Sequence, residues 1–200
     1  MAGTHYSPEK CSVARCNKNA LTRSQQCWEH LTDREAYLAA FDPKRGFEAW
    51  LVDVDLAGRD LRGANFAGAR MSKANLSKAD LRGANLCGTF LDGADLRGAD
   101  LSDADLEFAV LGAADVSDAL FRNANLRRAN LVGTKGCGAD FSGADLYYSR
   151  PGNSDFRRAK FVGAVLQRAI FRRANLAQAD LTGAVGQPNL ENANLEGTLR

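Results

Sequence analysis

ANLSKADLRG, residues 74–83, holds two successive five-residue units of the form Ala-(Asp/Asn)-Leu-x-x. Reading outward from this stretch, a large apolar residue occupies every fifth position from Leu56 to Leu181, and only Gly136 and Pro151 interrupt the series. In a helix, residues on one face lie three or four apart, so a period of five would spread the apolar residues around every face. The period therefore excludes an amphipathic helix.

A chain of short extended segments joined by corners would explain the five-residue period. Side chains two apart in an extended segment point the same way. The Ala and the large apolar residue of each unit should therefore face inward together, while the Asp or Asn between them faces outward and the last two residues turn a corner. One unit buries too little surface to fold alone, so the pattern predicts stacked coils, that is, a solenoid.

The repeat, as it stands in residues 74–83, resembles that of the pentapeptide repeat proteins, and the resemblance covers residues 51–200. It implies an all-β solenoid, a right-handed quadrilateral β-helix with one repeat per side and about four repeats per coil. At about 4.8 Å between coils, residues 51–200 would form roughly seven coils and a rod on the order of 35 Å long. We expect six inward phenylalanines in its core: Phe66, Phe121, Phe141, Phe156, Phe161 and Phe171.

Two stretches of turn-forming residues, 133–138 and 147–153, replace regular units. Because the register resumes at Phe141 and Phe156, we predict a bulged corner at each stretch. After Leu181 the apolar positions fall at Val185, Leu190 and Leu195, which predicts a one-residue slip of phase at an irregular turn within 183–188.

The first 50 residues lack the repeat and form a separate N-terminal region, in which Cys11, Cys16, Cys27 and His30 are spaced as Cys-x4-Cys-x10-Cys-x2-His. Thiolate and imidazole ligands suit Zn²⁺, and the spacing resembles that of short Cys3His zinc modules. Four protein ligands would leave no position for an activated water, so we predict a structural zinc ion. The alternative is three reduced cysteines in a small folded cap.

Helix signals follow the cysteines. The segment 32–35 reads TDRE, a capping-box pattern in which Thr32 and Glu35 would satisfy the first free amides of a helix running through Phe41. Asp42 and Pro43 can start another short turn. Since the end coil of a solenoid exposes apolar side chains and unpaired backbone groups, we expect residues 1–50 to cover the first coil.

The composition limits the function. Apolar residues make up 45% of the chain, which is ample for a core, but no run approaches the roughly 20 apolar residues of a membrane span. Without a charged-then-apolar leader, we expect a cytoplasmic protein. No Gly-rich phosphate loop follows a strand, and no nucleophile has a plausible base at motif spacing, so we predict that the chain is not an enzyme.

Charge divides along the repeat region. Residues 91–119 hold eight acids and one base, whereas residues 120–175 hold eleven bases and three acids. The acids at the Asp/Asn position of the repeat can hydrogen-bond to turns, whereas most bases occupy corner positions. A basic band of this kind could attract phosphate or an acidic protein, although a solvated face is the plainer interpretation. The predicted partner-binding residues are Arg122, Arg127, Arg128, Tyr147, Tyr148, Arg150, Arg157, Arg158, Arg168, Arg172 and Arg173.

Three functional hypotheses follow. The first is a binding or scaffold protein, a rigid rod that presents the basic band 120–175 to a protein or nucleic-acid partner. The second comes from the resemblance, because some members of the family bind type II topoisomerases such as DNA gyrase and protect them from quinolones by imitating DNA. That mimicry needs an acidic rod, and residues 51–200 carry 19 bases and 18 acids. The third is a nucleic-acid-binding zinc module, with Lys10, Arg15, Lys18 and Arg23 as its bases.

Overall fold

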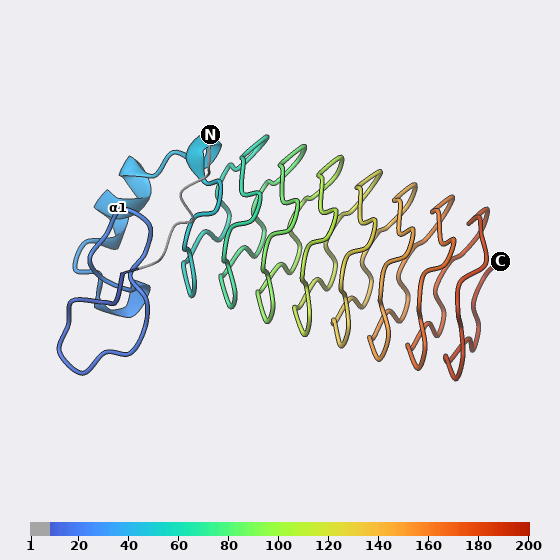
Figure 1. Ribbon diagram of the computed structural model, residues 1–200. Coiled ribbons are helices and arrows are strands. Elements are labelled where there is room, and N and C mark those ends of the chain that lie inside the picture. The colour runs from blue at the N-terminus through green and yellow to red at the C-terminus, as the bar shows by residue number, and fades with distance from the viewer. Residues whose placement is uncertain (1–8) are drawn as a thin grey trace, which may run out of the picture.

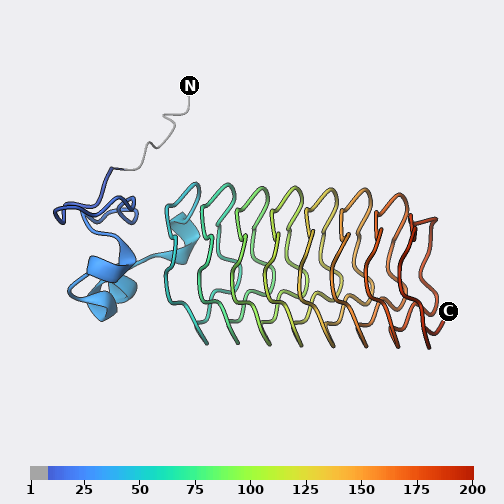
Figure 2. The ribbon, with the colours of Figure 1, turned by 90° about the horizontal axis from the view of Figure 1, so that it is seen from below.

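The computed structural model describes residues 9–200 as a short N-terminal region followed by a long solenoid (Figure 1). The N-terminal region contains the 3-10 helix Trp28–His30, the α-helix α1 at Arg34–Ala40 and the 3-10 helix Pro43–Arg45. The coils of the solenoid are stacked in chain order, so that position along the sequence is also position along the rod (Figure 2).

The helix α1 is capped differently from the prediction. Its N-cap is Asp33, whose carboxylate accepts a hydrogen bond from the amide of Ala36 at 2.8 Å. Thr32 was wrongly predicted as the cap, because the helix begins one residue later than the capping-box pattern requires. The Glu35 carboxylate instead faces the solenoid, where it lies 3.4 Å from the Arg59 guanidinium. The short turn predicted at Pro43 is confirmed, with the carboxylate of Asp42 accepting the amide of Lys44 at 3.0 Å.

Parallel backbone bridges hold the coils together. Most bridges of the solenoid join residues twenty apart, as in Asn75 with Asp95. Since one unit has five residues, one coil holds four units. The amide of Leu76 donates to the carbonyl of Asp95 at 2.7 Å, and the amide of Asn75 donates to that of Val54 at 2.8 Å. Within residues 9–200 these pairs are isolated bridges, and no strand of several residues is formed. The solenoid predicted from the five-residue period is thus present, with one paired residue on each side of a coil.

Each position of the unit has a physical role. The Ala and the large apolar residue are buried, as predicted. The outward Asp or Asn accepts the amide two residues later, as Asn75 does from Ser77 at 3.2 Å, and this bond starts the corner. At the corner the amide of Ala79 donates to the carbonyl of Leu76 at 3.1 Å, and Lys78 between them has a φ of 57°. Glycine adopts this left-handed conformation at least cost, and it occupies the same position in many other units.

The core is a stack of these inward residues. All six predicted phenylalanines are fully buried. The ring of Phe141 is parallel to those of Phe121 and Phe161, with centroids 4.8 Å and 5.0 Å away, and it meets Phe156 edge-on at 5.5 Å. Successive coils are therefore joined by ring contacts as well as by backbone bridges.

The bulged corners predicted at 133–138 and 147–153 are wrong, because the five-residue backbone pattern continues through both. Gly136 occupies an inward position, and a Cβ atom built there would lie 2.4 Å from the Phe156 ring of the next coil. The Phe156 ring thus fills the space that Gly136 leaves. Pro151 is buried at another inward position, where its lack of an amide hydrogen removes one rung of the backbone ladder.

The predicted slip of phase is confirmed. Val165 pairs with Val185, twenty residues later, but Ile170 pairs with Asn189, nineteen residues later. One residue is therefore missing from the turn between these bridges. Val185 takes an outward position and is 53% exposed, which corrects its placement in the apolar series.

The N-terminal region packs on the first coil. The backbone pattern begins at Gly46, one unit before residue 51, and Trp50 already pairs with Arg70. The Phe41 ring stacks on that of Phe66 at 6.1 Å. The amide of Trp50 donates to the Thr22 hydroxyl at 2.6 Å.

In the described part of the chain, no helix has the length and apolar composition needed to cross a membrane.

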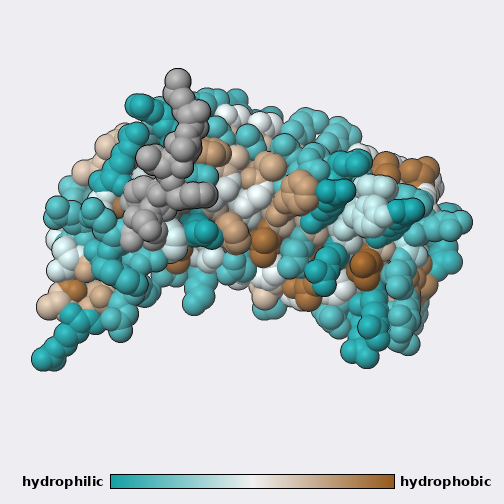
Figure 3. All heavy atoms as spheres, in the orientation of Figure 1, coloured by the Kyte–Doolittle hydropathy of each residue, from teal (hydrophilic) through white to brown (hydrophobic). Residues whose placement is uncertain are grey.

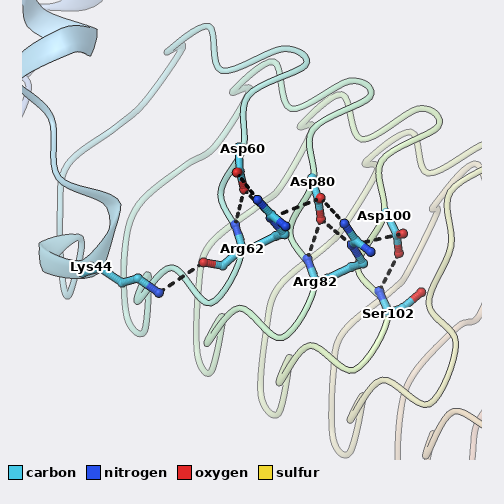
Figure 4. Close-up of polar contacts among 7 residues, drawn as sticks. All are labelled: Lys44, Asp60, Arg62, Asp80, Arg82, Asp100 and Ser102. Carbon is cyan, nitrogen blue, oxygen red and sulfur yellow. Dashed lines mark hydrogen bonds and ion pairs between the residues drawn. The ribbon is translucent and has the colours of Figure 1, made fainter.

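One side of the rod carries a ladder of alternating charges (Figure 4). Arg62 pairs with Asp60 at 2.6 Å and lies 3.6 Å from Asp80, and Arg82 pairs with Asp80 at 2.6 Å and lies 3.7 Å from Asp100. Hydrogen bonds from Arg62 lower the pKa of Asp60 to about 2, and those from Arg82 lower the pKa of Asp80. These carboxylates are consequently more stable in their charged form when the chain is folded.

We expect the charge ladder to make the stability of the folded chain fall at acid pH. A lowered pKa in the folded state contributes stability above the unfolded pKa of about 3.9, and this contribution is lost as the pH falls toward 2. The substitution Asp80→Asn keeps an oxygen for the corner amide but removes the charge. Thermal unfolding followed from pH 5 to pH 2 should therefore show a smaller fall in Tm for D80N than for the wild type. Equal slopes would contradict this, and 1 M salt should reduce the difference.

Candidate metal centre and charged surface

Four potential ligand side chains converge in the N-terminal region. The ligand atoms of Cys11, Cys16, Cys27 and His30 all lie within 4.8 Å of one another. The Nδ1 atom of His30 is 3.5 Å from the sulfur of Cys11 and 3.4 Å from that of Cys27, and the sulfurs of Cys16 and Cys27 are 3.9 Å apart. The structure thus brings together the four residues that the sequence spacing selected.

These separations suit one tetrahedral ion. Zinc binds sulfur at about 2.3 Å and imidazole nitrogen at about 2.0–2.1 Å. In a tetrahedron these lengths place two sulfurs about 3.8 Å apart and a sulfur and a nitrogen about 3.6 Å apart. The separations of His30 Nδ1 from the sulfurs of Cys11 and Cys27, and of the Cys16 and Cys27 sulfurs from each other, lie within a few tenths of an ångström of these values. The donor set and its geometry therefore fit a zinc ion.

Backbone hydrogen bonds hold the ligands in place. The amide of Cys11 donates to the carbonyl of Lys18 at 3.0 Å, and the amide of Cys16 donates to that of Val13 at 3.1 Å. Cys27 precedes the 3-10 helix Trp28–His30 and accepts the His30 amide on its carbonyl at 3.1 Å, so both side chains of the second pair leave the same turn. The short helix sets this pair opposite the loop of Cys11 and Cys16.

The thiols differ in their electrostatic surroundings. Burial raises the pKa of Cys11, but hydrogen bonds to the backbone of Cys27 and Val13 and to His30 outweigh it and bring the pKa down to about 6. Burial is the main cause that raises the pKa of Cys27. Since metal ligation requires the thiolate, the Cys11 sulfur is better prepared to bind than that of Cys27.

The corner residues of the basic band are spread around the rod. We name the four sides of the coil by their outward residues. Side A contains Trp50 and the outward residues that the series of backbone bridges links to it, one in each coil. Sides B, C and D are defined in the same way, starting from Asp55, Asp60 and Asn65. By this register Arg122 is on the corner after side C, and Arg157 and Arg158 are on the corner after side B. The remaining eight predicted residues lie on side A or on its two corners: Arg127, Arg128, Tyr147, Tyr148, Arg150, Arg168, Arg172 and Arg173.

Part of the basic band is neutralised locally. Arg122 pairs with Asp140 at 2.8 Å, Arg127 with Asp145 at 2.9 Å and Arg157 with Asp155 at 2.7 Å. Arg172 lies 3.5 Å from Glu191. These arginines are less available to a partner than their number in the sequence implies.

The corner between sides D and A combines aromatic rings with arginines. The rings of Tyr147 and Tyr148 meet edge-on at 4.6 Å. The guanidinium of Arg127 lies over the Tyr147 ring, and that of Arg168 lies over the Tyr148 ring and donates to its hydroxyl. One coil away from the tyrosines, Arg128 lies over the ring of Phe108, with 5.4 Å from guanidinium carbon to ring centroid. The tyrosine pair covers no bulge, and its rings pack against arginines instead.

The repeat aspartates of the acidic band and Lys18 of the N-terminal region already have partners within the chain. Each Asp of the repeat in residues 91–119 accepts the amide two residues later, as expected: Asp95, Asp100, Asp105 and Asp115. Lys18 pairs with Glu29 at 2.6 Å and with Asp53 at 2.9 Å, which raises the pKa of Lys18.

One feature of side A was not predicted from the sequence. Its outward column never carries an acid, whereas Asp or Asn is the usual outward residue on the other three sides. The sequence does contain a signal for this feature, since a residue other than Asp or Glu recurs every twenty positions. That period can be interpreted only when the number of residues per coil is known. The members of this non-acidic column are Trp50, Arg70, Phe90, Val110, Asn130, Arg150, Ile170 and Asn189.

Comparison with protein families agrees with this architecture. The model of a family described as pentapeptide repeats matches residues 51–86, 79–118, 114–147 and 152–185, with eight copies. The chain belongs to the pentapeptide repeat family. Inside the matched range the family match leaves out only residues 148–151, which include Tyr148 and Pro151. Among curated proteins, the comparison finds no match.

Solved structures of other pentapeptide repeat proteins are similar to the chain. HetL, involved in heterocyst differentiation regulation in the cyanobacterium Nostoc sp. strain PCC 7120, is 25% identical over 82% of this chain and 89% of its own, with a TM-score of 0.41. A trypsin-treated form of QnrB1, a plasmid-mediated fluoroquinolone resistance protein, is 21% identical over 79% of this chain and 86% of its own, with a TM-score of 0.49. Rfr23 from the cyanobacterium Cyanothece 51142 is 25% identical over 75% and 82%, with a TM-score of 0.29.

Proposed function

We propose that this member of the pentapeptide repeat family is a non-enzymatic binding or scaffold protein of the cytoplasm. In this proposal a rigid, right-handed rod presents a charged surface to a protein or nucleic-acid partner. A zinc ion bound by Cys11, Cys16, Cys27 and His30 would hold the N-terminal cap in its folded form.

The separation of charge along the rod carries the proposal. Because one coil has twenty residues, the acidic residues 91–119 and the basic residues 120–175 become successive lengths of one rod. A rigid surface that is negative along one part of the rod and positive along the next orients a charged partner and raises its association rate. Solenoids commonly bind partners along such extended surfaces.

The zinc ion would have a structural role. Three thiolates and one imidazole complete a tetrahedron, so no position is left for a reacting water. The ion would supply the cross-links between the Cys11 loop and the turn that carries Cys27 and His30. Free thiols and bound zinc are compatible with a reducing compartment, which supports the cytoplasmic location.

Imitation of DNA is the weaker alternative. It needs free carboxylates along the rod, and the repeat acids of residues 91–119 accept corner amides. Asp95 is also paired with Arg97, at 2.6 Å. Protection of a topoisomerase from quinolones therefore receives less support than binding through the basic length.

An affinity capture from cell lysate tests the proposal. The wild type is compared with a variant carrying Arg→Glu at 157, 158, 172 and 173, with and without nuclease, and bound zinc is measured on the same samples. We expect the wild type to retain a defined partner that the variant loses, because four charges of the basic length are reversed. Nuclease-sensitive capture identifies nucleic acid, and nuclease-resistant capture identifies a protein. Identical capture by both proteins would rule out binding through the basic length.

A further inference from the structure

We propose that side A is the partner-binding face and that its partner is a protein segment with an acidic part and an apolar part. This inference rests on the proposed binding function and adds to it the face and the class of partner. The acidic part of the segment would lie on the C-terminal half of side A, and the apolar part on the N-terminal half.

The first evidence is the charge of the C-terminal half. Arg150 is the outward residue here, and Arg128 and Arg168 stand on the neighbouring corner. Within residues 9–200, none of these three arginines forms an ion pair with a carboxylate. Between residues 127 and 173 the corners on both edges of side A contain no acid. Although Arg127 and Arg172 on these corners are paired with carboxylates, Arg128, Arg150 and Arg168 keep this half of side A positive, and it complements an acidic partner.

The second evidence is the way two of these arginines are held. Arg168 lies over the Tyr148 ring and Arg128 over the Phe108 ring. A guanidinium that is stacked on a ring has lost much of its freedom before any ligand arrives, and it keeps N–H groups for a carboxylate. Binding an acid here thus costs less side-chain entropy than binding to free arginines.

The N-terminal half of side A is apolar. Its outward residues include Trp50, Phe90 and Val110, and Phe108 on the neighbouring corner is 48% exposed. Apolar side chains also interrupt the hydrophilic surface of the rod in the space-filling view (Figure 3). Aromatic residues and arginine are the types enriched at protein interfaces, whereas the other three sides present mostly Asp and Asn.

The orientation of the rings favours a protein over a nucleic acid. Single-stranded nucleic acids bind aromatic platforms by stacking bases on open ring faces. On side A the guanidinium carbon of Arg70 lies 4.4 Å from the Phe90 centroid and 5.5 Å from that of Trp50, and Arg168 lies over Tyr148. Since arginines already occupy these ring faces, few remain for bases. Apolar side chains and carboxylates, in contrast, need only ring edges and N–H groups.

The length of the face is sufficient for a peptide. Trp50 and Ile170 are six coils apart, which corresponds to roughly 29 Å at about 4.8 Å per coil. An extended segment of about nine residues, at about 3.3 Å per residue, would cover this length. A short linear segment can therefore contact both halves at once.

A peptide selection tests the proposal on the zinc-loaded full chain. Displayed random 16-residue peptides are selected, and the Kd values of enriched synthetic peptides are measured by fluorescence anisotropy, with a 20-residue oligothymidylate as a second probe. The side-A variant carries Arg→Glu at 128, 150 and 168. The matched control carries Lys→Glu at 78, 135 and 160, residues on or beside sides B and C, which makes the same charge change away from side A. Circular dichroism verifies that both variants fold.

We expect enriched peptides to combine Asp or Glu with apolar residues and to bind the side-A variant at least about tenfold more weakly, with little change for the control. Equal weakening in both variants, or weakening in the control alone, would overturn the assignment of side A while leaving the binding function intact. Tight oligothymidylate binding that only the side-A variant loses would overturn the partner class. If neither probe binds the wild type, this inference is wrong, and the lysate capture then decides the broader function separately.

Discussion

We expect the substitution Cys27→Ser to abolish zinc binding at the Cys-His cluster and to unfold the N-terminal cap, while the solenoid keeps its coils. The cap cannot rely on a hydrophobic core, because its buried apolar residues within 9–45 are only Cys11, Ala20, Leu21 and Cys27. Regions this small usually need a metal or disulfides to fold. The apparent binding free energy of structural zinc, about 10–16 kcal/mol in zinc-finger peptides, is large enough to decide whether the cap folds.

The measurement combines metal content with amide hydrogen exchange. The wild type should hold one zinc ion per chain and show slow exchange at the amides of Cys11 and Leu21, which donate to backbone carbonyls within the cap. In Cys27→Ser these amides should exchange rapidly and the metal should be lost. The matched control is Cys87→Ser, which removes a cysteine from a solenoid corner and should retain the ion.

Two results would contradict the prediction. One is a wild-type chain that carries no zinc after purification without chelators and takes none up when zinc is added. The other is a chain whose cap amides remain protected after the ion is removed with a chelator. In that second case the three cysteines would be reduced residues of a cap that folds through the contacts of Thr22 and Phe41 with the first coil.

The sequence predicts the parts of this structure that depend on local spacing. The five-residue period places the inward residues correctly, and the Cys-His spacing selects four side chains that converge. Both depend on residues close in the chain. The irregular units could not be read in the same way, because the space at Gly136 is filled by Phe156, twenty residues later. A glycine at an inward position can mark a bulged corner, or it can belong to a regular unit in which a side chain of the next coil fills the empty space. Local sequence does not distinguish these two cases.

The surface was predicted less well than the core, for a related reason. Counting bases over 120–175 treats neighbours in sequence as neighbours in space, but consecutive units lie on different sides of the rod. Arg157 and Arg172 are therefore on different corners, whereas Arg128 and Arg168 share one, two coils apart. In this fold, residues twenty apart lie in one column on the surface. Side A can therefore be recognised only when the sequence is compared at that spacing.

Replacing Phe141 with alanine will produce one of the largest losses of stability of any change to a single core ring. Phe141 is fully buried and contacts three other rings: Phe121 and Phe161 in parallel, and Phe156 edge-on. Deleting a buried phenylalanine costs about 3–5 kcal/mol through lost transfer free energy and the cavity left behind. Each aromatic pair adds about 0.5–1.5 kcal/mol, so the cost should lie at the upper end of that range.

Urea unfolding followed by circular dichroism measures this loss, and Phe108→Ala is its matched control. Phe108 is 48% exposed on a corner, so its truncation should cost less than about 1 kcal/mol. Because each coil of a solenoid contacts only its neighbours, the Phe141→Ala variant should also show faster hydrogen exchange in residues 121–161 than in residues 56–90. Equal costs for the two substitutions would mean that the ring stack adds little to the joining of coils. The backbone bridges and aliphatic layers would then hold this part of the rod together by themselves.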